Sequence, residues 1–372
     1  MVSSRALCWI TAATLSFCAV GQTAVLVEPP PGDPLELVTG QIEPASTAAM
    51  RQSAVEFLGR AQANYALATA GQAYRLSVTF TVNSGGKTQY DGVWWMDQTF
   101  DPRYGLRWTA ESEGGYTITE ISANGQRYSD GTPGYIPLRL HEARAALFDP
   151  IPSAGYAAHA GIRTSTATFH GNEVTCVLIA GTHSAFASAP ARRWDESEDC
   201  IDPQSGLLMV HSQVPGRYFA YDYTNAPQFA GHVFPSSITV TEGGKTVSRI
   251  SVDRLEPLPA ADPSLFVPTP QMLEGGEAPA LAGAQKFSRV LSMDPSAGAA
   301  TARFVCVFGL LTASGELVEA HSLQPSDPYS AAAVAAALQI HFPRPKLPGQ
   351  IVPQPQQHFV FVIEKFVPSN QS

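Results

Sequence analysis

Apolar and polar residues alternate without a break over residues 75–82. Every second side chain, beginning with Leu76, would face one side of a strand, and the polar residues between them would face the other. The next 50 residues continue as short segments of the same kind, separated by turn sequences such as Asn124-Gly125. Strands joined by short turns pair antiparallel, so this pattern predicts one curved antiparallel sheet.

A second strand, turn and strand follow further along the chain. Asp202-Pro203 begins a turn, residues 207–210 form an apolar run, and Pro215-Gly216 leads into an aromatic segment. Cys200 lies at the mouth of this hairpin, and Cys176 lies in the upstream strand-like run. We therefore expect these cysteines to lie on adjacent antiparallel strands and to form a Cys176–Cys200 disulfide.

The N-terminus has the features of an export signal over residues 1–24. Arg5 supplies a positive charge, residues 6–20 form a short apolar core, and small residues follow it. This core is shorter than the roughly 20 residues that cross a bilayer. We expect cleavage and export to the periplasm or outer-membrane periphery of a Gram-negative-type bacterium. A lipidated or uncleaved N-terminus is the alternative.

The rest of the chain divides into two predicted domains. An extended lead-in (25–45) precedes a helix that Ser46 or Thr47 can cap and a sheet domain ending at residue 268. A linker rich in Pro, Gly and Ala is expected at 269–295, and a small domain at 296–372. The small domain has the order strand, strand, helix, strand. Its first strand, 303–311, is nearly all apolar, as in a strand covered on both faces.

Composition and motifs argue against several kinds of function. Lys and Arg number 23 and Asp and Glu 32, a net charge of −9, and the largest basic cluster is Arg192-Arg193. Nucleic-acid binding is therefore not expected. The sequence has no HExxH, CxxC or GxSxG motif, so we expect no metal site, no cofactor and no catalytic role. Cys306, within an apolar run, is expected to be a buried thiol.

Two family resemblances add to this interpretation. The DPQSGLL segment (202–208), the FPSSI segment (234–238) and the segment 262–266 occur in an order that resembles the outer-membrane lipoprotein carrier superfamily, LolA and LolB. The resemblance covers about residues 46–268. It implies an α+β fold with an N-terminal helix and a half-open antiparallel β-barrel. In that family the barrel surrounds a hydrophobic cavity that holds acyl chains.

Residues 296–367 are similar to the C-terminal domain of TonB-type energy transducers. The similar features are the Ser314-Gly315 turn, the Ser326-Asp327 helix start and the segment 341–345 that ends an alanine-rich helix. The resemblance implies a β-β-α-β domain that docks on an envelope protein by adding a strand to a sheet edge.

These observations predict a non-enzymatic envelope protein that binds an apolar or acylated ligand, a lipid or a lipoprotein. The alternatives are a TonB-type transducer with an uncleaved N-terminal anchor and an envelope enzyme of unknown class. Adjacent Trp94 and Trp95 must point to opposite faces if they lie on a strand. The candidate residues of the apolar cavity are Trp94, Trp95, Phe100, Trp108, Tyr116, Phe148, Tyr218 and Phe219.

Overall fold

The computed structural model describes residues 37–84, 90–132, 136–180, 191–274, 285–292, 303–311, 315–342 and 358–367. The expected signal sequence, residues 1–24, lies outside these ranges. Among the described residues, no helix is both long and apolar enough to span a bilayer.

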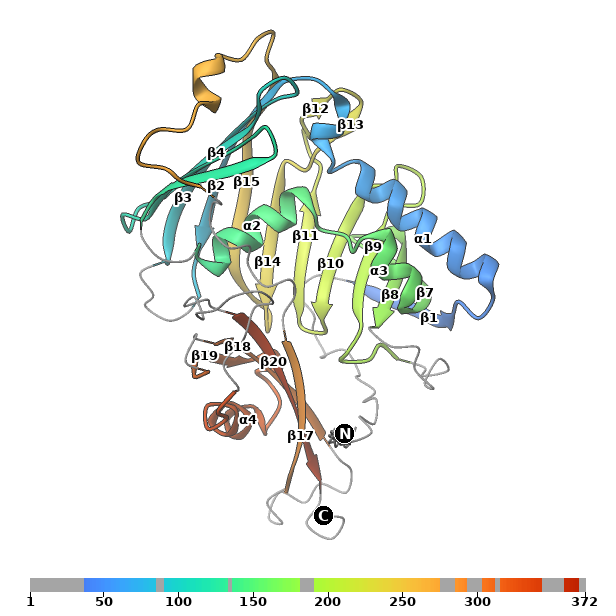
Figure 1. Ribbon diagram of the computed structural model, residues 1–372. Helices are drawn as coiled ribbons and strands as arrows, with labels where there is room; N and C mark the ends of the chain where they lie inside the picture. The colour runs from blue at the N-terminus through green and yellow to red at the C-terminus, as the bar shows by residue number, and fades with distance from the viewer. Residues whose placement is uncertain are drawn as a thin grey trace, which may run out of the picture.

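A 14-stranded antiparallel sheet forms the larger part of the molecule (Figure 1), in the order β1-β7-β8-β9-β10-β11-β14-β15-β2-β3-β4-β5-β6-β16. The sheet does not close, because the outer strands β1 and β16 are not paired with each other. Its strands are β1 (Val38–Pro44), β2 (Tyr74–Val82), β3 (Gly92–Asp101), β4 (Gly105–Ser112), β5 (Thr117–Ala123), β6 (Gln126–Gly131), β7 (Gly161–Phe169), β8 (Asn172–Ala180), β9 (Ser197–Ile201), β10 (Leu208–Val214), β11 (Arg217–Asp222), β14 (Ser237–Glu242), β15 (Lys245–Pro257) and β16 (Leu273–Glu274). A separate hairpin pairs β12 (Gln228–Phe229) with β13 (His232–Val233).

Strand β2 confirms the alternation on which the sheet prediction rests. Leu76, Val78, Phe80 and Val82 are all buried, while the residues between them are half-buried or exposed. The buried face packs beneath three helices, α1 (Ala48–Ala63), α2 (Leu138–Phe148) and α3 (Ala154–His159), and together they form one core. Short 3-10 helices occur at Leu67–Ala70 and Pro263–Phe266. Figure 1 shows α2 crossing in front of β11 and β14, with α1 and α3 beside it. We call the side of the sheet that these helices cover its helix-covered face.

The helix expected after the lead-in begins as predicted but ends early. Thr47 is the N-cap, and its hydroxyl accepts a hydrogen bond from the Met50 backbone N–H at 3.2 Å. The helix ends at Ala63, and Gly71, with φ +67°, ends the short turn that follows. The predicted extended lead-in is extended at its end, where β1 pairs with β7.

A second sheet of four strands carries the C-terminal part, in the order β17-β20-β18-β19. It consists of β17 (Gln285–Ser292), β18 (Arg303–Leu311), β19 (Leu317–Ser322) and β20 (His358–Val367), with α4 (Ser330–Ala337) between β19 and β20 in the sequence. The expected order strand, strand, helix, strand is present. Strand β17 lies in the range that the sequence predicts to be a linker. It forms part of the sheet by pairing in parallel with β20. The helix begins at Ser330, and Asp327 accepts a hydrogen bond from Tyr329 N in the preceding turn.

Strand β18 is covered on both faces, as its sequence predicts. Val305 and Val307 pack with Ala333 and Ala337 of α4 on one side. On the other side Cys306 and Phe308 pack against the large sheet, in a cluster with Trp194 and Val214. Cys306 is fully buried and is not part of a disulfide, as expected. The small sheet therefore uses one face for its own helix and the other for docking.

The β10–β11 turn touches the small sheet closely enough to require glycine. Gly216 has φ +85°, and a Cβ atom built on it would lie 2.8 Å from the Leu323 carbonyl oxygen. Gly206 has a similar φ, +72°, but nothing lies within 4 Å of its Cβ position. Replacing either glycine would therefore strain the backbone, but a side chain would also clash with its neighbours only at Gly216.

We predict that Gly216→Ala lowers the free energy of unfolding by about 1–3 kcal/mol more than Gly206→Ala does. Urea unfolding of both variants gives the difference. Equal losses would mean that the β10–β11 turn is not in contact with the small sheet in solution.

Candidate functional site at the junction of the two sheets

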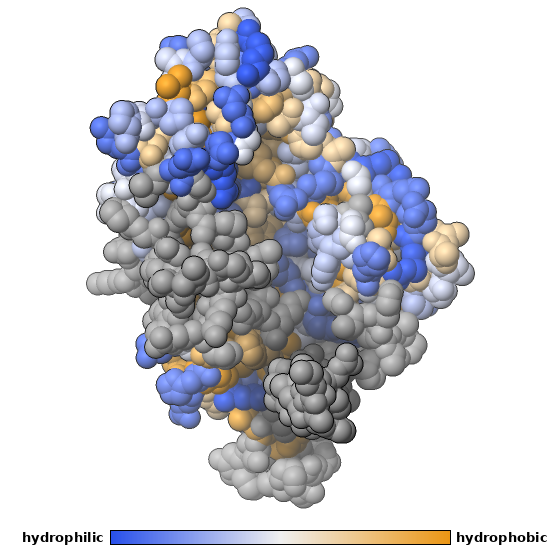
Figure 2. Space-filling view, in the orientation of Figure 1, coloured by the Kyte–Doolittle hydropathy of each residue, from blue (hydrophilic) through white to orange (hydrophobic). Residues whose placement is uncertain are grey.

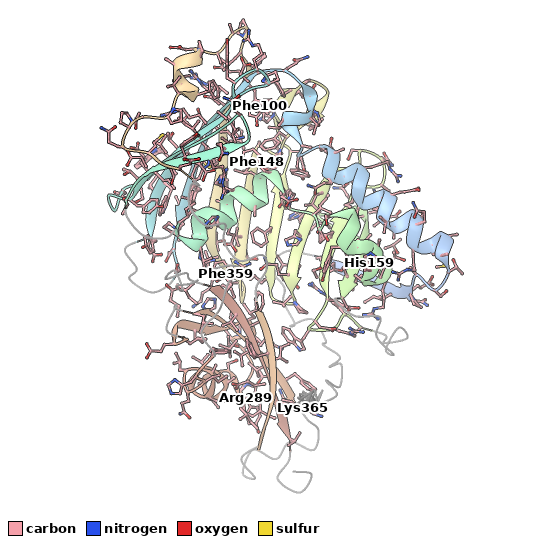
Figure 3. The ribbon with its side chains drawn as sticks, in the orientation of Figure 1. Phe100, Phe148, His159, Arg289, Phe359 and Lys365 are labelled. Atoms are coloured by element: carbon pink, nitrogen blue, oxygen red, sulfur yellow. A yellow bond between two sulfur atoms is a disulfide. The ribbon has the colours of Figure 1, made fainter. Side chains whose placement is uncertain are left out.

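Six of the eight predicted cavity residues belong to one core or pack against it, and the other two lie elsewhere. Trp94, Trp108, Tyr116 and Phe219 are fully buried or nearly so, in the core beneath the helices. Phe100 and Phe148 are only partly buried and pack against that core. Figure 3 shows Phe148 at the end of α2. Whether any of them contacts a ligand stays a prediction.

The other two predicted residues, Trp95 and Tyr218, point away from the helix-covered face of the large sheet. Trp95 is 41% exposed, whereas Trp94 is fully buried and stacks on Phe80 with 5.6 Å between ring centroids. This confirms that the adjacent tryptophans face opposite sides of β3. Tyr218 is buried in the cluster that contains Cys176 and Cys200, on the face of the large sheet opposite the helices.

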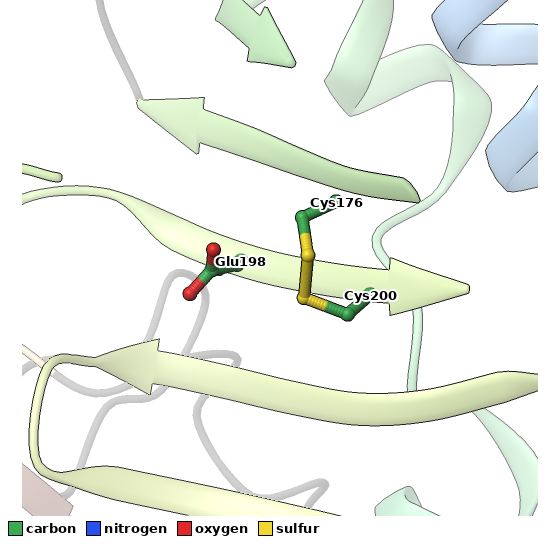
Figure 4. Close-up of side chains that lie close together, drawn as sticks. All are labelled: Cys176, Glu198 and Cys200. Atoms are coloured by element: carbon green, nitrogen blue, oxygen red, sulfur yellow. A yellow bond between two sulfur atoms is a disulfide. The ribbon is translucent and has the colours of Figure 1, made fainter. Parts of the chain in front are cut away.

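The predicted disulfide is present between Cys176 of β8 and Cys200 of β9 (Figure 4), which are paired residues in the ladder. The Glu198 carboxylate lies beside the two sulfurs, a grouping that resembles a metal site. However, the sulfurs are bonded to each other and cannot act as thiolates. Glu198 also forms an ion pair of 2.8 Å with Arg192. The group is therefore a structural cross-link beside an ion pair.

We predict that replacing both Cys176 and Cys200 with serine lowers the free energy of unfolding by about 2–4 kcal/mol. The cross-link spans 24 residues, so its loss releases chain entropy in the unfolded state. Urea unfolding of the oxidised protein and the double variant measures the effect. An unchanged midpoint would contradict the prediction.

A cluster of buried charges joins the large sheet to α2 at the junction. Glu242, at the end of β14, accepts hydrogen bonds from Arg139 of α2 at 2.8 and 3.2 Å and from Arg217 of β11 at 2.9 Å. Glu142 of α2 pairs with both arginines. The side chains of Arg217 and Glu242 are fully buried. Two arginines thus face two glutamates, and we call these four residues the junction charge cluster.

The small sheet closes over this cluster with aromatic rings. The Arg217 guanidinium carbon lies 4.7 Å from the centre of the Phe308 ring and 5.2 Å from that of Phe359. Arg139 makes similar contacts with both rings, at 5.5 and 5.1 Å. Figure 3 shows Phe359 at the end of the small sheet, near the beginning of α2. Cation–π contacts of this kind gain strength when they are desolvated.

His321 of β19 adds a further contact from the small sheet. Its Nε2 atom lies 2.9 Å from Glu242 Oε2, and its side chain is 30% exposed. Burial opposes the charged form of Glu242, but Arg139 and Arg217 outweigh burial and, with His321, hold the pKa of Glu242 well below its usual value. The carboxylate therefore stays ionised at neutral pH.

Sequence reasoning missed these charges. Arg217 and Glu242 are cross-strand partners at the ends of β11 and β14, each next to a glycine turn. Charged residues beside turns are normally solvated, so their sequence positions give no sign of burial. The only local signal is the aromatic content of the small sheet, whose Phe308 and Phe359 need a partner surface.

A groove of about 940 Å³ opens beside this cluster, between the β14–β15 turn, β19 and α4. Its apolar lining includes Val247 of β15 and Val334 and Leu338 of the α4 region. Its polar lining consists of Asn83, Ser84, Glu242, Lys245, Thr246, Glu319, His321, Ser322 and Ser330. Burial raises the pKa of Glu319. None of the eight predicted cavity residues lines this groove.

Figure 2 shows polar residues along the outer side of α1, and both apolar and polar residues on the visible part of the small domain. Leu338 is 50% exposed, although it follows α4 directly and lines the groove. An exposed leucine beside a groove is a typical feature of a binding surface.

Comparisons with known proteins find likeness only among solved structures. No family model matches the chain, and no curated protein matches it. A LolA superfamily protein from Nitrosomonas europaea is 10% identical, with a TM-score of 0.36, over 58% of this chain and 97% of that one. A putative outer membrane lipoprotein-sorting protein domain from Vibrio parahaemolyticus is 8% identical, with a TM-score of 0.35, over 58% and 97%.

A DUF1329 family protein from Desulfovibrio piger is 8% identical, with a TM-score of 0.35, over 58% of this chain and 96% of that one. At such identities and scores, the likeness carries no conclusion about this chain's ligand. The fold rests on the strand pairing described above. Membership of the small domain in the TonB family stays a prediction.

We predict that Arg217→Met lowers the free energy of unfolding by about 3–5 kcal/mol, because Glu242 and Glu142 lose a buried partner. Arg254→Met is the matched control, since Arg254 and Glu256 form an exposed pair at 3.4 Å and such pairs contribute about 0–1 kcal/mol. Urea unfolding compares the two. Similar losses would mean that the junction charge cluster is solvated.

We also predict that acid weakens the fold through Glu242. Its folded pKa is lowered, so its contribution to stability is complete above the unfolded value and is lost as pH falls toward the folded one. Stability should therefore decline below about pH 4.5, and more steeply in the parent than in Glu242→Gln. Urea midpoints between pH 3 and 7 test this slope. Parallel pH profiles of parent and variant would contradict the prediction.

Proposed function

We propose that this chain is an exported, non-catalytic binding protein of the bacterial cell envelope, and that an apolar or acylated amphiphile binds in the groove between its two sheets. The observation that carries the proposal is the groove of about 940 Å³, whose lining combines apolar and polar side chains. This volume falls within the range of about 300–1,000 Å³ that small-ligand sites occupy.

The apolar and polar residues that line the groove fit the two parts of an amphiphile. An acyl chain would lie along Val334, Leu338 and Val247, where burial of apolar surface supplies affinity without any reactive group. The polar head would face Lys245, which brings a positive charge, and the hydroxyls of Ser322 and Ser330.

The cross-link and the N-terminal sequence support the proposed compartment. A disulfide between Cys176 and Cys200 forms and persists in an oxidising environment such as the periplasm. The apolar core at residues 6–20 supports export by a signal sequence. The TonB-type transducer with an uncleaved anchor is the alternative, and the N-terminal residue of the mature protein separates the two.

Partner docking by strand addition remains part of the proposal, but only through the edges of the small sheet. One face of β18 packs on α4 and the other on the large sheet, so neither face is open to a partner. Strands β17 and β19 are the outer strands of the small sheet and offer its backbone edges. An envelope protein with an unpaired strand could extend the sheet there.

We predict that Leu338→Lys raises the dissociation constant of a fluorescent acyl probe by about tenfold, because it places a charge among the apolar residues of the groove. Val267→Lys is the matched control, since Val267 is apolar, 62% exposed and outside the groove. Probe fluorescence titration measures both constants.

A third variant locates the ligand if the groove is not its site. Phe148 lies on the helix-covered face and is only partly buried. Loss of probe binding in Phe148→Lys but not in Leu338→Lys would place the ligand under α2, as the sequence resemblance implies. Saturable binding by none of the proteins, the parent included, would overturn the proposed function.

A further inference from the structure

Among the described residues, the guanidinium of Arg144 on α2 has an aromatic contact but no hydrogen bond and no ion pair. Its guanidinium carbon lies 3.8 Å from the centre of the Trp108 ring. Its Nε atom is buried and has no hydrogen-bond partner. No ion pair to Arg144 occurs within the described ranges, although three buried arginines elsewhere in the protein are paired at 2.9 Å or less. These are Arg139, Arg163 and Arg217.

The groups around Arg144 do not neutralise it. Burial lowers the pKa of Arg144 to about 10, Arg127 adds to the effect, and Glu120 and Tyr74 oppose it. Glu120, the acid that acts on Arg144, accepts a hydrogen bond from Trp108 Nε1 at 3.2 Å. Burial, with Arg144, also lowers the pKa of His141 to about 4, so that His141 is neutral at pH 7. Among the described residues, no ion pair therefore neutralises the charge of Arg144.

A second polar group beside Trp108 also lacks a partner. Gln98 is the cross-strand neighbour of Trp108 and is only 3% exposed. Its amide nitrogen donates to the Tyr74 hydroxyl at 2.8 Å, but its Oε1 atom is buried and unpartnered among the described residues. A buried carbonyl oxygen without a donor costs about 1–3 kcal/mol. The indole of Trp108 is thus flanked by an unused donor group and an unused acceptor.

We propose that Arg144 and Gln98 form a binding site for a phosphate group on the helix-covered face of the large sheet. The group supplies anionic oxygens for the guanidinium, which binds phosphate in a bidentate manner. Its singly protonated form, which predominates below a second pKa of about 6 for a monoester, also carries a hydroxyl that can donate to Gln98 Oε1. The source is either free phosphate or the head group of an amphiphile. The site is separate from the groove and does not depend on the proposed function.

Titration calorimetry with three probes tests the site in the full chain: inorganic phosphate, dodecyl phosphate and dodecanol. We expect saturable binding of dodecyl phosphate, at least about tenfold tighter than dodecanol. Arg144→Met should remove that difference, whereas Arg254→Met, on an exposed arginine, should leave it unchanged. Equally tight binding of inorganic phosphate supports a free anion as the ligand, and tighter binding of dodecyl phosphate supports an amphiphile.

Thermal melting shows whether Arg144→Met folds. The variant removes a partly buried charge that has no ion-pair partner among the described residues, so its melting temperature should equal or exceed that of the parent. Phosphate should raise the melting temperature of the parent but not of Arg144→Met. Unaltered phosphate binding in the variant, equal affinity for dodecyl phosphate and dodecanol, or no saturable binding of either phosphate would overturn the proposal. The acyl-probe titration of the groove reports separately on the proposed function.

Discussion

The junction charge cluster holds the two sheets in one arrangement. Arg139, Arg217, Glu142 and Glu242 form a neutral group of four charges, and removing any one leaves a buried charge uncompensated. The planar faces of both guanidiniums lie against Phe308 and contribute to the apolar contact as well. Only a docked small sheet keeps water away from these ion pairs. The docking of the small sheet and the strength of the buried ion pairs therefore depend on each other.

The groove exists because of this docking. Its lining comes from both sheets, and Glu242 and His321 belong to the groove as well as to the junction. A ligand in the groove would therefore lie next to the contact that holds the small sheet in place. A ligand that binds the docked arrangement more tightly than the undocked one shifts the protein toward the docked arrangement. Binding and docking should thus strengthen each other, without any catalytic group.

The sequence predicts the local parts of this structure well. The alternation in β2, the two-sided apolar pattern of β18 and the Cys176–Cys200 pair each depend on neighbours within a strand or hairpin. Strand β17 escaped prediction because its partner, β20, lies about 75 residues away and the intervening composition resembles a linker. The disulfide depended on strand adjacency, which the hairpin pattern already implied.

The candidate site was less predictable, because long-range packing decides the environment of each side chain. Trp108 and Phe219 were proposed as cavity residues from their type alone, and the structure places both in the core that the sheet forms with the helices. Arg217 and Glu242 were not expected in any site, and become buried only when the small sheet docks. Nothing in the residues beside a turn indicates that another sheet will cover them. A sequence pattern gives the face of a strand, but not what packs against that face.

Two arginines, the fully buried Arg217 and the partly buried Arg144, illustrate how environment separates stability from function. Arg217 has carboxylate partners and lies over the Phe308 ring, so its burial is compensated and it stabilises the junction. Arg144 also stacks on an aromatic ring, Trp108, but lacks the carboxylate. An aromatic face offsets only part of the cost of desolvating a guanidinium. The uncompensated remainder is free energy that an incoming anion can recover, so the same side chain that weakens the empty protein would strengthen the liganded one.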